Sequence, residues 1–269
     1  EGEAQVVAPT VKVRRPRVAL PQVHLHEKGA RFAALIAKTA PLDPVRTGVV
    51  HPCDALSLEG ALEAAERGII IPVLIGPRGK IEAVALETKR DLEGVEIVDV
   101  PHSHAAADMA VSMARAGRIE MIMKGKLHTD ELLAPIVDKA TGLRTDRRIT
   151  HIFVLDVPHY PKPLLISDAA INIAPDLDAK RDIVQNAIDL AIALGNPLPK
   201  VAVLSAVETV TPTIPSSVDA AALCKMAQRG QITGGLVDGP LAFDNAVSSA
   251  AAKTKAIVSD VAGDADVLI

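Results

Sequence analysis

Short apolar runs rich in β-branched residues alternate with longer alanine-rich amphipathic stretches along most of the chain. The short runs predict buried strands, and the stretches between them predict helices. The predicted strands lie at residues 47–50, 69–75, 95–100, 119–123, 150–157, 164–166, 201–204, 235–237 and 265–269. This alternation is typical of an α/β fold built on parallel sheets.

The clearest helix signal is the segment DAKRDIVQNAIDLAIALG, in which Asp178 is placed to cap the start and Gly195 to end the helix. Its apolar positions recur at helical spacing, at Ile183, Ala187, Leu190, Ala191 and Leu194. Ser103 predicts a second helix start, and Ser216 or Ser217 predicts a third. We expect one or two compact α/β domains, because no fixed-period repeat occurs.

Composition narrows the possible partners. The 269 residues are 49% hydrophobic, and a net charge of -4 argues against binding to a nucleic-acid backbone. Aromatic residues are nearly absent, so base-stacking surfaces are not available. The sequence has no continuous apolar run of membrane-span length and no signal-peptide pattern. We therefore predict a soluble cytoplasmic protein that binds small molecules, with no nucleic-acid or membrane partner.

Several familiar motifs are missing. No G-x-G, P-loop, GxSxG or HExxH pattern occurs. Two His-x-His pairs, His24/His26 and His102/His104, lack a carboxylate at ligand spacing, and we interpret them as surface or capping residues. Cys53 and Cys224 lack zinc-site spacing and are expected to be reduced core residues. The sequence predicts no metal site.

Polar residues follow four of the predicted strands, where open α/β sheets place their ligands. The segments are KGKLHT, SDAAINIAPD, SAVETV and DGPLAFDN. Turns and helix caps use the same residue types, so ordinary loop chemistry is the alternative at each position. The candidate residues in these segments are Lys124, Lys126, His128, Thr129, Ser167, Asp168, Asn172, Ser205, Asp238, Asp244 and Asn245.

The KGKLHT segment predicts an anion site. Gly125 permits a tight turn after the strand, Lys124 and Lys126 bring two positive charges to its tip, and Thr129 is placed to cap the next helix. Arg144 is a second candidate for gripping phosphate oxygens. We expect Lys124 to be the more buried lysine, in an interdomain cleft near Arg144 and the SDAAIN loop. The alternative is a solvated turn.

Seven blocks together resemble one enzyme family. They are KGKLHT, GLRT, LLISDAAINIAPDL, KRDIVQNAI, LSAVETVTPTIPS, ITGGLVDGPLAFDNA and VAGDADVLI. In this order they resemble the phosphate acetyltransferase and phosphate butyryltransferase family, from about residue 45 onward. The chain is most similar to the form fused to an upstream enoyl-CoA hydratase-like domain, and residues 1–22 are expected to be a linker from such a domain.

The resemblance implies reversible transfer of a short acyl group, acetyl or butyryl, between CoA and inorganic phosphate. It implies CoA as a substrate, no tightly bound cofactor and a homodimer. It also implies a two-domain α/β/α fold like that of isocitrate and isopropylmalate dehydrogenases. Residues 23–148 and 259–269 would form the first domain, and residues 149–258 would form a second domain inserted in it.

The resemblance also suggests roles for the candidate residues. Lys124, Lys126 and Arg144 would supply positive charge to phosphate oxygens, while Asn172 and Ser205 would be catalytic as neutral donors near the carbonyl. The remaining candidates would contact substrate. A Ser-Arg segment that carries catalytic groups in the family has no match here, so no general base is assigned.

Two other functions stay open at this point. A metal-dependent NAD dehydrogenase uses the same architecture without G-x-G-x-x-G and would need clustered carboxylates, for which Asp168, Asp238 and Asp244 are candidates. An inactive CoA-binding fragment is the third possibility. The acyl chain length cannot be inferred, because one methylene changes discrimination by only about 1 to 3 kcal/mol.

Overall fold

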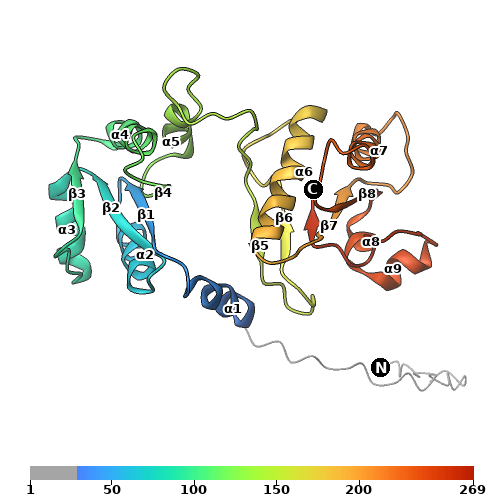
Figure 1. Cartoon of the computed structure of the whole chain (residues 1–269), viewed down its shortest axis with the longest axis horizontal. Helices are drawn as coiled ribbons and strands as arrows, with labels where there is room; N and C mark the ends of the chain where they lie inside the picture. The colour runs from blue at the N-terminus through green and yellow to red at the C-terminus, as the bar shows by residue number, and fades with distance from the viewer. Residues whose placement is uncertain (1–28) are drawn as a thin grey trace, which may run out of the picture.

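The computed structural model describes residues 29–269, which contain two separate β-sheets (Figure 1). The predicted linker, residues 1–22, and the His24/His26 pair lie outside the described residues. The first sheet has four parallel strands in the order β3-β2-β1-β4. Their bounds are β1 Val45–Val50, β2 Ile70–Gly76, β3 Glu96–Asp99 and β4 Met121–Lys124.

Helices cover both faces of the first sheet. They are α2 (Ala55–Glu66), α3 (Arg78–Thr88), α4 (Ser103–Arg115) and α5 (Thr129–Ile136). Val49 and Leu74 pack with α2 and α3 on one face, whereas Val50 and Ile75 pack with α4 and α5 on the other. Neighbouring strand residues alternate between the faces, so a strand covered on both sides is apolar at most positions. The polar exceptions include Arg46 and Thr47 in β1 and Glu96 and Asp99 in β3.

The second sheet has five strands in the order β5-β6-β9-β7-β8. Strand β5 is antiparallel to β6, and the other pairings are parallel. The strands are β5 Phe153–Leu155, β6 Leu164–Ile166, β7 Lys200–Leu204, β8 Leu236–Leu241 and β9 Val267–Leu268. One core contains side chains of α6 (Leu177–Ala193) and α7 (Pro215–Gln228). A separate core contains side chains of α8 (Phe243–Val247) and of residues 261–265, and the short helix α9 (Ser249–Thr254) follows α8 in the chain.

Strand β9 corrects one of the expected boundaries. The resemblance assigned residues 259–269 to the first domain, but Val267 pairs with Leu165 of β6 and with Val201 of β7. Val267 and Leu268 are almost fully buried in the two cores of the second sheet. The final strand is therefore a central strand of the second sheet.

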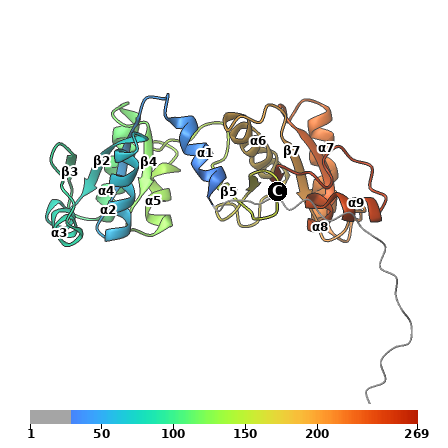
Figure 2. The ribbon, with the colours of Figure 1, turned by 90° about the horizontal axis from the view of Figure 1, so that it is seen from below.

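Helix α1 (Ala30–Thr39) precedes the first sheet in sequence but contacts the second unit, as the view in Figure 2 shows. Arg31 donates to the carboxylate of Asp156 at 2.9 Å and to the carbonyl oxygens of Val157 and Tyr160. Lys38 donates to the carbonyl oxygen of Leu194 at 2.7 Å. The alanine-rich N-terminal segment thus ties the two units together.

Each predicted strand overlaps an observed one, and the prediction of an α/β fold with parallel sheets is confirmed. The predicted caps were less accurate. Asp176, not Asp178, caps α6, and the imidazole of His102, not Ser103, accepts the capping bond of α4. Within residues 29–269, every helix is too short or too polar to span a bilayer.

Candidate active site

A carboxylate-centred turn follows β6 at the carboxyl edge of the second sheet. Asp168 Oδ1 accepts hydrogen bonds from the backbone amides of Ala170 and Ile171, and Oδ2 accepts from the amide of Asn172. Burial raises the pKa of Asp168, but the hydrogen bonds from Asn172 and the three amides outweigh it and leave the pKa below its usual value. Asp168 therefore stays ionised and organises the loop.

Asn172 is held by the same turn. Its side-chain Nδ2 donates to Asp168 at 2.5 Å and to the carbonyl oxygen of Ile149 at 3.1 Å. Both N–H groups of the amide are therefore used, whereas Oδ1 accepts no hydrogen bond from the described residues. The sequence predicted Asn172 as a donor to substrate; in this arrangement its free group is an acceptor. Ser167, just before the turn, is buried and donates to the carbonyl oxygen of His151.

A cavity of about 250 Å³ opens at this edge of the sheet. Three predicted site residues, Ser167, Asp168 and Asn172, line it. Ser205, at the end of β7, reaches the cavity through Ser216, because their hydroxyl oxygens lie 2.9 Å apart. The sequence reasoning missed three other polar residues in the lining, namely Lys180, Ser216 and Asp219.

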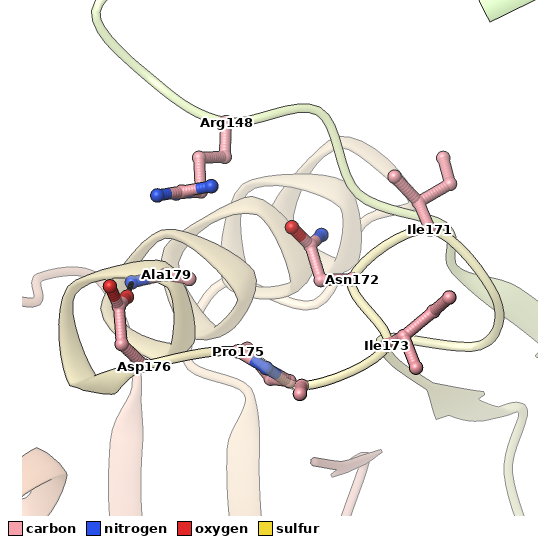
Figure 3. Close-up of a pocket in the computed structure, with 8 residues that line it drawn as sticks. Arg148, Ile171, Asn172, Ile173, Pro175, Asp176 and Ala179 are labelled. Atoms are coloured by element: carbon pink, nitrogen blue, oxygen red, sulfur yellow. Dashed lines mark hydrogen bonds between the residues drawn. The ribbon is translucent and has the colours of Figure 1, made fainter.

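A second cavity of about 280 Å³ lies on the other side of the same loop. Its lining includes Arg148, Asn172 and the first turn of α6 (Figure 3). Arg148 and Asn172 come from different segments and both line this space, as does Ile173, whose side chain is 97% exposed. Asn172 thus lines both cavities, and it is the predicted residue with the most central position.

The loops after β7 and β8 form a separate buried contact. Asn245 is fully buried and donates through Nδ2 to Glu208, which also accepts from Lys255 at 2.6 Å. The Lys255 hydrogen bond is the largest cause that lowers the pKa of Glu208. Asp244, the neighbour of Asn245, is exposed. Asn245 therefore belongs to a structural network in which Glu208 is the shared acceptor.

Asp238 corrects another prediction. The sequence placed it after a strand at residues 235–237, but β8 continues to Leu241 and Asp238 lies inside it. Its carboxylate accepts from the amide of Gly239. Its charge also adds to the effect of burial, which raises the pKa of Cys224 to about 11. Asp238 is thus a strand residue beside a protonated thiol.

The first sheet brings its loops together at a different point. The chain moves from β1 to β2 and β3 on one side and then places β4 on the other side of β1, so its direction reverses between β1 and β4. There Gly125 donates to the carbonyl oxygen of Val50 and Lys126 donates to that of His51, both at 2.9 Å. A Cβ on Gly125 would lie 2.4 Å from the Val50 oxygen, so only glycine permits this approach.

The predicted lysines lie at this point. Both Lys124 and Lys126 are exposed, so neither is the buried cleft residue that was expected, and which of the two is the more buried stays a prediction. Both lower the pKa of Asp54, although hydrogen bonds from Ser57 have the larger effect. Lys126 also opposes the effect of burial, which raises the pKa of Cys53. The lysines therefore form an exposed basic tip.

The remaining predicted residues of the first unit are also exposed. His128 occupies the N-cap position of α5 without a side-chain cap bond, so Thr129, predicted as the cap, is the first helical residue instead. Arg144 is exposed and makes no side-chain hydrogen bond or ion pair within residues 29–269. No hydrogen bond or ion pair among those residues joins Lys124, Lys126 or Arg144 to the Asp168 turn.

The described residues also bear on a dehydrogenase site. Within residues 29–269, no group of three or more His, Cys, Asp or Glu side chains is arranged to hold a metal ion. The cluster of Asp168, Asp238 and Asp244 that a metal-dependent dehydrogenase would need is therefore not formed in that part of the chain.

Comparison with known proteins decides the family. Residues 102–269 match the family model described as "Phosphate acetyl/butaryl transferase". A phosphate acetyltransferase from Rhizobium meliloti is 60% identical over 240 residues, covering 89% of this chain and 76% of that protein. The chain belongs to the phosphate acetyl/butyryltransferase family.

Relatives of this chain include phosphate butyryltransferases as well as phosphate acetyltransferases. A phosphate butyryltransferase from Clostridium acetobutylicum is 38% identical over 238 residues, covering 88% of this chain and 79% of that protein. A solved phosphotransacetylase from Streptococcus pyogenes superposes with a TM-score of 0.74 at 17% identity, covering 91% and 82% of the two chains, and supports the fold alone. The prediction of an acyltransferase is confirmed, and the dehydrogenase alternative is not favoured.

Proposed function

We propose that this protein transfers a short acyl group reversibly between CoA and inorganic phosphate. The observation that carries the proposal is the convergence of Ser167, Asp168 and Asn172 on one cavity at the carboxyl edge of the second sheet. Membership of the phosphate acetyl/butyryltransferase family gives the reaction class. The high identity to a phosphate acetyltransferase favours acetyl over butyryl as the acyl group.

The bonds that form and break show what the site must supply. The CoA thiolate attacks the carbonyl carbon of the acyl phosphate, the thioester C–S bond forms, and the C–O bond to phosphate breaks. Donors must face the carbonyl oxygen, because negative charge develops there in the transition state. Ser205 is suited to this role, since among residues 29–269 its hydroxyl hydrogen-bonds only to the Ser216 hydroxyl and can rotate toward substrate.

In this proposal Asn172 contacts substrate either as a hydrogen-bond acceptor or as a donor. With both N–H groups bound as described, its Oδ1 accepts from a donor on substrate, such as an amide of the pantetheine arm of CoA. If substrate displaces Ile149, one N–H becomes a donor to the carbonyl oxygen. Either contact positions the reacting thioester, which is the main contribution of a fixed amide at such a site.

Positive charge on the first unit completes the proposal. Lys124, Lys126 and Arg144 are exposed and bind phosphate groups of the substrates, with His128 and Thr129 beside them. Asn245 contacts substrate only if the Glu208 network rearranges, whereas Asp244 is exposed and is accessible without such a change. Asp238 is assigned no contact. A homodimer, an isocitrate dehydrogenase-like relation of the two units and a fused hydratase-like domain are further parts of the proposal that rest on family resemblance.

A thiol-release assay tests the function. The protein is mixed with inorganic phosphate and acetyl-, propionyl- or butyryl-CoA, and free CoA is measured with a thiol reagent. Phosphate-dependent release with acetyl-CoA as the best substrate is expected. Release that does not depend on phosphate would indicate a thioesterase, and reduction of NAD without CoA release would restore the dehydrogenase alternative.

A further inference from the structure

Lys180 places a positive charge in the cavity beside Asp168 and Asn172. It lies in the first turn of α6 and forms an ion pair with Asp219 of α7 at 2.5 Å. The two side chains are only 24% and 26% exposed, so the pair is partly removed from solvent. A partly exposed ion pair of this kind contributes little to stability. Stability therefore does not explain why the pair lies in a cavity.

We propose that Lys180 binds the phosphoryl group of the substrate in this cavity, and that Asp219 pairs with the ammonium group until phosphate displaces it. This inference rests on the proposed function and names a residue that the sequence reasoning did not select. The chemistry recognised is a phosphate dianion, either free or as the leaving group of an acyl phosphate.

Three features of the cavity support an anion there. Ser216 lies at the second position of α7 and lines the cavity, and the first turn of that helix carries no acidic residue, which favours an anion near this end of the helix dipole. The Ser205 and Ser216 hydroxyls are 2.9 Å apart, and the one that is not donating to the other is available to an oxygen of phosphate. Lys180 adds the full charge that two hydroxyls and a dipole lack.

Two carboxylates, those of Asp168 and Asp219, also line the cavity, and each already has hydrogen-bond partners in the protein. Both oxygens of Asp168 accept hydrogen bonds from the 170–172 amides, so the charge of this carboxylate is already stabilised by donors of the loop. Asp219 is paired with Lys180 and competes with phosphate for the same ammonium group. This competition makes the role of Lys180 testable, because removing Asp219 should have the opposite effect to removing Lys180.

The experiment compares variants in the acyl-CoA plus phosphate direction. Lys180→Met should raise the KM for phosphate about tenfold or more while the KM for acetyl-CoA stays within about twofold. Lys180→Arg should keep part of the phosphate affinity. Asp219→Asn should lower the KM for phosphate, because the carboxylate that competes for the ammonium group is removed. Lys225→Met, on an exposed part of α7, is the matched control and should change neither constant.

Each other outcome overturns the inference. If both Lys180→Met and Asp219→Asn lower the melting temperature and neither changes the KM for phosphate, the pair only joins α6 to α7. If the KM for acetyl-CoA rises instead, the cavity receives a phosphate of CoA. If only Arg144→Ala raises the KM for phosphate, phosphate is bound by that exposed arginine.

A binding measurement separates this inference from the proposed function. Calorimetry with inorganic phosphate is run on the wild-type protein, Lys180→Met and Lys225→Met. Phosphate binding that is lost only in Lys180→Met supports the site even if no thiol release is detected, in which case the proposed function alone fails. Equal phosphate binding by all three proteins, or none by the wild type, overturns the site.

Discussion

The carboxyl edges of the two sheets use their polar residues in opposite ways. At the second sheet, Asp168 and Asn172 hydrogen-bond to each other and to the backbone around a cavity. At the first sheet, backbone bonds around Gly125 hold the loops, and Lys124 and Lys126 remain exposed. Side chains fixed in a partly dry site can orient a reacting group, whereas exposed lysines supply charge over a distance.

This difference suggests a division of labour between the units. Chemistry that depends on the position of single atoms belongs at the second sheet, where rotamers are already fixed. Recruitment of anionic substrates needs only charge and is suited to the exposed tip of the first sheet. Substitutions at the two edges should therefore differ in both the size and the kind of their effect.

The largest effect is expected at Asn172. Asn172→Ala removes the amide that contacts Asp168 and Ile149, and kcat/KM should fall about 100-fold, as when an oriented polar group of an acyl-transfer site is lost. Steady-state kinetics of thiol release measure this change. Asn196→Ala is the control, because that amide accepts only from Leu198 in the α6–β7 loop. Equal losses in both variants would remove Asn172 from the site.

At the first sheet, the backbone should matter more than the side chains. Gly125→Ala places a methyl group 2.4 Å from the Val50 carbonyl oxygen, and the free energy of unfolding should drop by about 1 to 3 kcal/mol. Urea denaturation measures this quantity. Gly79→Ala in α3 meets no atom within 4 Å and should be neutral or slightly stabilising. An unchanged stability in Gly125→Ala would show that the two loops separate easily.

The Asp168 turn should show a particular dependence on pH. Because the folded pKa of Asp168 is lowered, its ionised form stabilises the fold above the unfolded pKa of about 3.9 and loses this contribution as pH falls through the folded value. Asp168→Asn should therefore be less stable than wild type near pH 7 by on the order of 1 kcal/mol, with the gap closing in acid.

Chemical denaturation between pH 7 and pH 3 measures this gap. Asp178→Asn is the matched control, since that carboxylate is exposed and pairs only with Arg181 at 3.4 Å. A constant difference between wild type and Asp168→Asn over the whole range would show that the loop does not depend on the charge.

The smallest effects are expected from the exposed lysines. Lys124→Met and Lys126→Met should each raise the KM for CoA or phosphate only about two- to fivefold, because exposed charges are screened by salt. The increase should disappear at high ionic strength, which steady-state kinetics at two salt concentrations can measure. A salt-independent loss of more than about tenfold would instead place that lysine in direct contact with substrate.

Much of the architecture could be predicted from the chain itself. Strands covered on both faces are mostly apolar, so each of them overlapped an apolar run in the sequence, and the alternation with helices predicted parallel sheets. Ser167, Asp168 and Asn172 were also found from the sequence, because a polar segment directly after a buried strand lies at the ligand edge. Such predictions depend only on residues that are close together in the sequence.

The tertiary structure decided what local rules could not. The place of β9 between β6 and β7 depends on pairing of Val267 with Leu165 and with Val201, both of them far from it in sequence. Lys180 and Asp219 meet only because α6 and α7 pack side by side, and neither helix pattern marks them as partners. Whether Asn172 is a donor or an acceptor depends on Ile149, which reaches it from another segment. Residue type was determined by the sequence, whereas the partner of each residue was determined by packing.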